Sequence, residues 1–552
     1  MSTVLDCETT SADSHSCRLL GCAIKVDTAP ARFLVPTDAD VLKLTQPIIA
    51  HNGKFDAVVY ARYYGVAPVI QFDTMIAAYL LHIDRRRKLE SLAYEFLDTA
   101  KEDLLGVYNR TTGNTRKNLP ADWFEHVPHT ELARYAEADA ETEYALYQYF
   151  LNEFSKDPIL YEWFTGVEMP VLNLLVQSEL RGVQIDRGYL QGLRETLLER
   201  TKYYQIKIGR HVPLDMNLNS PKQLNKLLFD TLELHPIRRT KTGFSTDHRT
   251  LELLSEVHCI PKWLLRLREL DKLVTGFVIP LLEKTTDETP TIHTTYNQAL
   301  TDTRRFSSEN PNLQNIPVKT AEGKKLRGAF KASPNTYFGI FDYDQIELRL
   351  LAHFSQDETL CSLFESGVDI HDETSKMINV DRRVGKILNF SLIYGKTAYG
   401  LAQDLRCSEA DAQAFIDAYF ARFPGVRQWM LQQHEHAIAV GGWTRSLADL
   451  PLFVNHIYSH STKEREHAKR CAVNYPIQSS SQDVLKLAMV QIQKDCQLVP
   501  VLMVHDELVY ELPITTSPTA MRDRIVDIME HVVKLRVLLK VTARLSPTWE
   551  KL

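Results

Sequence analysis

The sequence predicts two domains, an α/β domain followed by a larger α+β domain that is rich in helices. The length of 552 residues exceeds what one hydrophobic core usually holds. Up to about residue 155, short apolar runs alternate with helical patterns, which is typical of an α/β domain. From about residue 165 the pattern is mostly helical, and acid-bearing strands interrupt it.

The composition is that of an ordinary globular protein. Apolar residues make up 44% of the chain and charged residues 24%. No run of about 18 apolar residues occurs, and the N-terminus lacks a basic flank, so neither a membrane span nor a signal peptide is predicted. Eight cysteines without a C-x-x-C pair indicate a reduced, cytoplasmic compartment. A net charge of −6 does not exclude a nucleic-acid enzyme, because acidic metal sites offset basic binding surfaces.

Two helix starts are predicted early in the second domain. Asp186 is placed to cap a helix with a 3.6-residue apolar period. The apolar stripe of this helix comprises Leu190, Leu193, Leu197 and Ile208. Ser220 followed by Pro221 predicts a second start, with an N-cap and then proline at the first helical position.

Two strands of the second domain are predicted next to acidic residues. Residues 338–343 form an apolar run that reaches Asp342. Residues 501–510 predict a strand, a tight turn through His505, Asp506 and Glu507, and a second strand. The intervening residues 371–470 are predicted to be mainly helical.

The first domain contains three pairs of polar residues with regular spacing, each with at least one acid. Asp6 and Glu8 are two apart on a predicted strand, so both point from one face. Two pairs spaced by four would each share a face of a helix, namely Asn52 with Asp56 and Tyr135 with Asp139. Hard divalent cations prefer such carboxylate oxygens. Each pair alone is better explained as a solvated cap, but the three together favour a metal site.

The second domain has candidate metal anchors in Asp342 and Asp506, although a lone aspartate at a strand end is often only a turn former. Two metal ions held by such acids support phosphoryl transfer, and polymerases are among the known two-metal enzymes. Residues 382–395 add a stripe with four-residue spacing, made of two cations and two aromatics. The stripe comprises Arg382, Lys386, Phe390 and Tyr394. Cations suit a triphosphate and aromatics suit a base and sugar, whereas the alternative is an amphipathic helix with snorkelling cations.

The acidic motifs of the first domain resemble the DEDD family of 3′→5′ exonucleases, in the variant with tyrosine in the third motif. The resemblance implies two metal ions held by Asp6, Glu8, Asp56 and Asp139. It also implies that Tyr135 orients the attacking water. Every member of the set is present, so an active nuclease is predicted.

The motifs of the second domain resemble those of family A DNA polymerases. Motif A is DYDQIELR (342–349), motif B is RRVGKILNFSLIYG (382–395) and motif C is HDE (505–507). Three further segments fit the family, namely TDTRRFSS (301–308), PNLQNIP (311–317) and RCAVNYPIQ (470–478). The resemblance covers essentially the whole chain. It implies an RNase H-like exonuclease domain followed by a right-hand polymerase domain, with a helical thumb, an antiparallel-sheet palm and helical fingers.

The resemblance also implies domain bounds. The exonuclease domain is expected at 1–155 and the polymerase domain at 156–552. Within the latter we expect the thumb at about 165–290, the palm at about 291–370 and 471–552, and the fingers at about 371–470.

Roles at the polymerase site follow from the same resemblance. Asp342 and Asp506 would bind the metals, with Glu507 assisting, and Lys386 would be the general acid for pyrophosphate. Glu347 would exclude a ribose 2′-hydroxyl. Phe390 would pack on the sugar, Tyr394 would close on the nascent base pair, and both Arg382 and His371 would contact the triphosphate. The residues expected at the nucleotide are Arg382, Lys386, Phe390, Tyr394, His371, Glu347 and Tyr343. The residues expected at the DNA are Arg305, Gln314, Asn315, Arg470, Asn474, Gln478 and His505.

Cofactors and partners are implied as well. We expect two Mg²⁺ ions per active site, with Mn²⁺ as the substitute, and primer–template DNA with dNTPs as substrates. The chain is expected to be a monomer that does not bind a membrane. It begins directly at the exonuclease motifs and has a short thumb region, so a phage-type polymerase acting in the host cytoplasm is predicted, without a role in Okazaki-fragment processing.

Three residues depart from the family pattern. Asp344 stands where serine is usual, and Arg304 and Phe306 stand where glycine and leucine are usual. These departures leave fidelity and primer affinity open.

Two alternative functions are considered. A single-subunit RNA polymerase shares the palm chemistry, but Glu347 and the proofreading motifs argue against it. A non-catalytic DNA-binding scaffold is disfavoured by the intact acids at both sites, and it would never extend a primer.

Overall fold

The computed structural model describes residues 2–38, 44, 46–81, 86–212, 216–241, 243–318, 320–515 and 517–550. The chain divides into two compact units. Unit 1 comprises Met1–Gly182, His293–Asn310 and Asn335–Leu545. Unit 2 comprises Val183–Ile292, Pro311–Pro334 and Ser546–Leu552.

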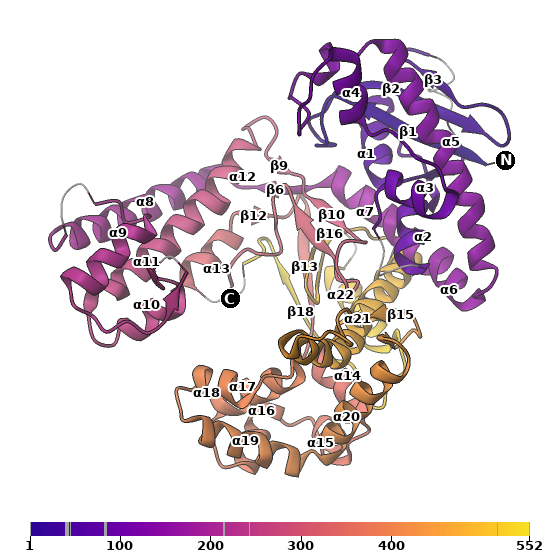
Figure 1. Ribbon diagram of the computed structural model, residues 1–552. Helices are drawn as coiled ribbons and strands as arrows, with labels where there is room; N and C mark the ends of the chain where they lie inside the picture. The colour runs from indigo at the N-terminus through magenta and orange to yellow at the C-terminus, as the bar shows by residue number, and fades with distance from the viewer. Residues whose placement is uncertain are drawn as a thin grey trace. The chain divides into compact units, whose positions relative to one another are not determined.

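The N-terminal part of unit 1 is an α/β domain built on a five-stranded sheet of order β3-β2-β1-β4-β5 (Figure 1). The central strand β1 is antiparallel to β2 and parallel to β4. The strands are β1 (Thr3–Thr9), β2 (Leu19–Val26), β3 (Arg32–Leu34), β4 (Ile48–Ala50) and β5 (Ile70–Asp73). The helices are α1 (Gly53–Tyr64), α2 (Thr74–Leu81), α3 (Leu89–Leu97), α4 (Leu104–Thr112), the 3₁₀ turn η2 (Trp123–Glu125) and α5 (His129–Phe154). Helix α5 packs along β1 and β2, so the predicted α/β domain is confirmed.

A helical stretch follows this domain within unit 1. It consists of α6 (Pro158–Trp163), the π-helical turn η3 (Phe164–Glu168) and α7 (Met169–Arg181). Residues Pro158–Arg181 are long and apolar enough to pass a length-and-composition test for a membrane span, which buried core helices also pass. Here 61% of the most apolar window is buried within the protein.

The second sheet of unit 1 has the order β16-β17-β13-β18. Strands β13 and β16 each pair antiparallel with β17, as an antiparallel palm sheet requires. The strands are β13 (Thr336–Tyr343), β16 (Pro500–Val504), β17 (Glu507–Pro513) and β18 (Val541–Ser546). All five residues of β16 are buried, which explains its continuous apolar sequence. The short strands β10 (Thr295–Asn297) and β11 (Ser307–Glu309) pair separately.

Helices dominate the rest of unit 1. They are α14 (Ile346–Ser355), α15 (Glu358–Glu365), α16 (Ile370–Met377), α17 (Arg382–Ile393), α18 (Ala398–Leu405), α19 (Glu409–Arg422), α20 (Pro424–Ala439), α21 (Thr462–Cys496) and α22 (Pro518–His531). The region 371–470 is mainly helical as predicted. It also contains a hairpin of β14 (Trp443–Arg445) and β15 (Pro451–Phe453), which the helical prediction missed.

Unit 2 is mostly helical. Its helices are α8 (Arg187–Gly209), α9 (Pro221–Asn225), η4 (Lys226–Thr231), α10 (His248–Leu254), α11 (Cys259–Leu273), η5 (Val274–Val278), α12 (Ile279–Glu283) and α13 (Ala321–Arg327). Its strands are β6 (Val183–Ile185), β7 (Arg239–Thr240), β8 (Gly243–Phe244), β9 (Thr291–Ile292) and β12 (Phe330–Lys331). Asp186 accepts from the Tyr189 N–H at 2.9 Å, and Ser220 accepts from the Gln223 N–H at 3.4 Å, so both predicted helix starts are confirmed.

Candidate active sites

The first carboxylate site forms where β1 meets α5. The pleat of β1 places Asp6 and Glu8 on one face, and α5 brings Asp139 to the same face. One carboxylate oxygen from each of these three residues lies within 4.8 Å of the others. Oxygens this close could share a metal ion.

Asp56 reaches this site from α1. Its Oδ1 accepts a hydrogen bond at 2.9 Å from the N–H of Cys7, the residue between Asp6 and Glu8 in the sequence. This bond holds the Asp56 carboxylate against β1. The predicted helical pairing of Asn52 with Asp56 is wrong. Asn52 precedes α1 in the left-handed conformation, with φ 60°, so it does not share a helical face with Asp56.

Burial and mutual repulsion perturb these acids. Burial raises the pKa of Glu8 to about 8, with Asp139 and Asp56 adding to the rise. Burial also raises the pKa of Asp56 to about 7 and that of Asp139 to about 6. The pKa of Asp6 is raised by burial and then by Glu8, and its Oδ2 has no hydrogen-bond partner among the described residues. A buried cluster of hard oxygen donors, one of them without a hydrogen-bond partner, fits divalent cations.

Tyr135 lies one helical turn before Asp139 on α5, as predicted. Burial raises the pKa of its hydroxyl, and the negative charges of Asp139 and Glu8 raise it further, so the phenol stays protonated.

Two residues of this site escaped the sequence analysis. Lys101 forms an ion pair with Asp139, and its ammonium lies 4.4 Å from the centre of the Tyr135 ring. Glu143, one turn after Asp139, is buried, and burial raises its pKa. The i, i+4 spacing of Asp139 and Glu143 was a signal for the second residue, whereas no pattern marks Lys101.

The second carboxylate site lies on the sheet of β13 and β17. Asp342 on β13 stands directly opposite Glu507 on β17, and Asp506 occupies the turn before β17. The Tyr343 N–H donates to the Asp506 carbonyl at 3.3 Å. Burial raises the pKa of Asp506 to about 7, with Glu347 and Asp342 adding to the rise and Arg305 opposing it. The structure therefore brings together the acids whose meeting the sequence could not show.

Glu347 is the centre of a polar network beside these acids. The Tyr394 hydroxyl donates to its Oε2 at 2.5 Å, and Arg305 forms an ion pair with its Oε1. Both carboxylate oxygens of Glu347 thus have a partner within the protein, and the ion pair holds the Arg305 side chain in place.

Helix α17 presents the predicted stripe on the side away from its buried residues. Arg382 pairs with Asp369 at 2.6 Å and Asp372 at 2.7 Å, while Lys386 is exposed. The helix ends at Ile393, so Tyr394 is its C-cap and not a helical residue as predicted.

A cavity of about 390 Å³ opens beside the aromatic end of this stripe. Its lining comprises Phe390, Ser391, Tyr394, Gly395, Lys396, Thr397 and Arg470.

His371 lies deeper than a triphosphate contact suggests. It is 4% exposed, and its Nδ1 faces the Asn389 amide nitrogen at 3.1 Å. Asn389, which the sequence analysis missed, also donates to Thr374 at 3.1 Å.

The other predicted DNA contacts are dispersed. Three of them recur every four residues on α21 and are partly exposed, as a shared helical face requires, namely Arg470, Asn474 and Gln478. His505 is exposed in the turn with φ 57°. Gln314 and Asn315 belong to unit 2.

The three departures from the family pattern have structural counterparts. Asp344 accepts from the Thr542 hydroxyl at 2.8 and 3.0 Å. Arg304 adopts φ 58° and is fully buried, and its guanidinium donates to the Pro451 carbonyl at 2.6 Å. A positive φ favours glycine, so a buried contact compensates a strained backbone. Phe306 is buried in the core.

The arrangement defines a chain with two separate carboxylate sites, one in an α/β domain and one on an antiparallel sheet. Comparison with known proteins gives the family. The family model for DNA polymerase family A matches residues 187–551, and that for 3′-5′ exonuclease matches residues 3–155. The chain belongs to DNA polymerase family A and carries a 3′-5′ exonuclease domain.

Individual relatives agree. The chain is 35% identical to DNA polymerase I of Treponema pallidum, over 92% of this chain and 51% of the relative. It is also 35% identical to DNA polymerase I of Bacillus subtilis, over 89% of this chain and 56% of the relative. The chain therefore spans about half the length of these relatives. Among solved structures, it is similar to the POL domain of Pol1 from M. smegmatis in complex with DNA primer-template and dNTP. That match has a TM-score of 0.87 at 27% identity and covers 100% of this chain and 96% of the other.

Proposed function

We propose that this protein is a DNA-directed DNA polymerase with its own 3′→5′ proofreading exonuclease. One observation carries the proposal: the β16–β17 turn brings Asp506 beside Asp342, next to the Glu347 network. The similar Pol1 structure holds DNA primer-template and dNTP, which supports the same substrates here.

Both sites would hold divalent cations, and we propose Mg²⁺, with Mn²⁺ as the substitute. Asp342 and Asp506 would hold them at the polymerase site. At the exonuclease site the holders would be Asp6, Glu8, Asp56 and Asp139. When bound, such ions activate the attacking oxygen and neutralise charge on the phosphate and leaving group.

The chain's own residues would bind and orient the nucleotide. Lys386 is exposed on α17 and would donate a proton to the departing pyrophosphate, while Arg382 would exchange its carboxylate partners for the triphosphate. Phe390 would pack on the sugar and Glu347 would exclude a 2′-hydroxyl. The His371 ring is tilted against that of Phe390, with ring centres 5.5 Å apart, so His371 would support Phe390 besides contacting the triphosphate.

Remaining roles follow the same assignment. Glu507 would assist the metal ligands. Tyr343 would line the nucleotide site with its backbone, because its hydroxyl points away and donates to the Met529 carbonyl at 2.9 Å. Tyr394 would close on the nascent base pair after leaving Glu347. The proposed DNA contacts are Arg305, Gln314, Asn315, Arg470, Asn474, Gln478 and His505.

The same assignment divides the chain into functional parts. We propose an exonuclease domain at 1–155 and a polymerase domain at 156–552. Within the latter the thumb would cover about 165–290, the fingers about 371–470, and the palm about 291–370 and 471–552. The compact segment Val183–Ile292 of unit 2 supports a separate thumb.

At the exonuclease site, Tyr135 would orient the water that attacks the terminal phosphodiester. Its phenol is held protonated and can donate a hydrogen bond, so it positions the water without removing the proton.

The biological setting is DNA replication. Replication of a phage genome in the host cytoplasm, by a monomer, stays a prediction.

One primer-extension assay tests the proposal. A labelled primer–template is incubated with dNTPs, with NTPs or without nucleotide, each with and without Mg²⁺. We expect extension with dNTPs, shortening without nucleotide, and neither reaction without Mg²⁺. Extension with NTPs alone would indicate an RNA polymerase, and DNA binding without any extension would indicate a scaffold.

A further inference from the structure

Lys101 brings a buried positive charge into the exonuclease site. It lies on the segment between α3 and α4, and its side chain is only 6% exposed. Its ammonium pairs with Oδ1 of Asp139 and lies 4.4 Å from the centre of the Tyr135 ring. Burying an ammonium group is costly unless it is paired, so the pairing accounts for this position.

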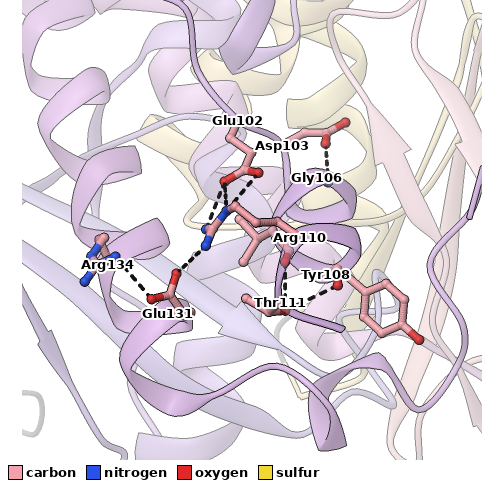
Figure 2. A network of polar contacts seen from close by, with 9 residues as sticks. Glu102, Asp103, Gly106, Tyr108, Arg110, Thr111, Glu131 and Arg134 are labelled. Atoms are coloured by element: carbon pink, nitrogen blue, oxygen red, sulfur yellow. Dashed lines mark hydrogen bonds and ion pairs between the residues drawn. The ribbon is translucent and has the colours of Figure 1, made fainter. Parts of the chain in front are cut away.

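A polar network begins at the residue that follows Lys101 (Figure 2). The next residue, Glu102, accepts from the Arg110 Nε at 3.2 and 3.3 Å and from its Nη2 at 3.1 Å. Arg110 also donates to Glu131 at 2.9 Å, and Arg134 donates to the other oxygen of Glu131 at 3.1 Å.

This network connects the Lys101 segment to the helix that carries the site. Glu131 lies in the first turn of α5, which also provides Tyr135 and Asp139. On the other side of Lys101, Asp103 caps α4 by accepting from the Gly106 N–H at 2.8 Å. The backbone around Lys101 is therefore tied both to α4 and to the beginning of α5.

Two contacts show what Lys101 can do there. An ammonium above an aromatic face is attracted to the ring, so Lys101 restrains the orientation of Tyr135. Its charge also opposes the repulsion among the neighbouring carboxylates, since it acts against the charges of Asp6, Glu8 and Asp139.

We infer that Lys101 is a positioning residue of the exonuclease, which holds the Tyr135 ring and the Asp139 carboxylate in their working orientation. The inference rests on the proposed exonuclease function and extends it to a residue outside the DEDD motifs. Lys101 acts through Tyr135 and Asp139, so its charge matters more than any contact of its own with DNA.

The test compares Lys101→Met, which keeps length but loses charge, with Lys101→Arg, which keeps charge. Lys117→Met, an exposed lysine of the same domain, is the matched control. Single-turnover excision of a single-stranded oligonucleotide is measured at saturating Mg²⁺. We expect Lys101→Met to lower the rate by about 10- to 100-fold, as losing a residue that orients metal ligands typically does, and Lys101→Arg to recover most of it. Lys117→Met should match the wild type.

Mn²⁺ binding, followed by electron paramagnetic resonance, provides the second readout. It is measured in an Asp342→Ala, Asp506→Ala background so that the polymerase site does not contribute. We expect Lys101→Met to keep Mn²⁺ binding, because all four carboxylates remain and the loss falls on the orientation of Tyr135 and Asp139. Loss of Mn²⁺ binding together with excision would reveal a damaged site and overturn the inference.

The failure of the inference is distinguishable from that of the proposed function. If the wild type excises and Lys101→Met excises equally fast, only the inference is overturned. If the wild type extends primers but excises nothing, the proposed exonuclease function fails, and the inference fails with it.

Discussion

The two carboxylate sites use the same kind of ligand but are assembled differently. At the exonuclease site, Asp6, Asp56 and Asp139 come from a strand and two helices, and their charges are buried together. At the polymerase site, strand pairing places Asp342 opposite Glu507 and leaves Asp506 in the adjoining turn. Strand register fixes the polymerase acids, although β13 and β17 are far apart in the sequence, whereas the exonuclease acids depend on the packing of a strand against two helices.

The sites also differ in how they offset negative charge. Glu347 at the polymerase site is satisfied by Tyr394 and Arg305. At the exonuclease site, Lys101 pairs with the carboxylate of Asp139. One oxygen of Asp6 has no hydrogen-bond partner among the described residues. The exonuclease domain should therefore depend more strongly on bound metal for its stability.

The largest expected effect concerns the polymerase site alone. Lys386→Ala should reduce the single-turnover rate of dNTP incorporation by about 10²- to 10⁴-fold, the usual cost of losing a general acid. The measurement is rapid-quench extension at saturating dNTP, with excision of a single strand as the control. A change confined to dNTP affinity would reduce Lys386 to a phosphate clamp.

A smaller effect is expected at the sugar. Phe390 offers no hydrogen-bonding group, so the incoming 3′-hydroxyl must find its polar partners elsewhere. Their loss with a dideoxynucleotide should cost about 1–3 kcal/mol, the usual penalty for an unsatisfied buried group. Phe390→Tyr should supply a hydroxyl and largely erase the preference for dNTP over ddNTP. Competitive incorporation in an Asp6→Ala, Glu8→Ala background measures this, and equal discrimination by both proteins would show that Phe390 does not face the sugar.

Glu347 should set sugar selectivity through its side chain. Glu347→Ala opens space for a 2′-hydroxyl and releases both Tyr394 and Arg305. We expect roughly a tenfold gain in NTP use relative to dNTP, equivalent to about 1.4 kcal/mol. Glu347→Gln keeps the size and is the matched control. If the alanine variant discriminates between NTP and dNTP as the wild type does, Glu347 does not exclude the 2′-hydroxyl.

The last effect is on stability and tests the charge difference between the sites. The folded-state pKa values of Glu8, about 8, and Asp56, about 7, lie above their usual 4.5 and 3.8. The metal-free folded protein therefore holds protons that the unfolded chain releases. Its stability should be greatest below about pH 4 for these groups and fall as the pH rises towards 8.

Thermal unfolding in EDTA at pH 5.5 and 8.5 measures this fall. Each kcal/mol lost should lower the melting temperature of the exonuclease domain by about 2–4 °C. Mn²⁺ should restore the melting temperature at pH 8.5, and Glu8→Gln should flatten the pH dependence. A pH-independent melting temperature in EDTA would contradict buried, uncompensated acids.

Local patterns predicted much of the fold and of both sites. The two-residue period placed Asp6 and Glu8 on one face, and caps such as Asp186 marked helix starts. The four-residue stripe of α17 was correct as far as Phe390 and failed at Tyr394, because Gly395 adopts a positive φ and the helix ends before it.

Tertiary contacts could not be predicted in the same way. Lys101 lies on a connecting segment, where no periodicity fixes the direction of a side chain. The burial of His371 against Asn389 depends on how α16 packs on α17. The buried position of Arg304 depends on Pro451 in a distant hairpin.

The central claim is that two independent sites serve two activities, and reciprocal inactivation tests it most directly. Asp6→Ala with Glu8→Ala is compared with Asp342→Ala on one labelled primer–template, with extension and excision read in the same reactions. The account predicts that the first protein extends nearly as the wild type does and no longer excises, while the second excises and no longer extends. Loss of both activities in either protein, or continued excision by the double variant, would contradict it.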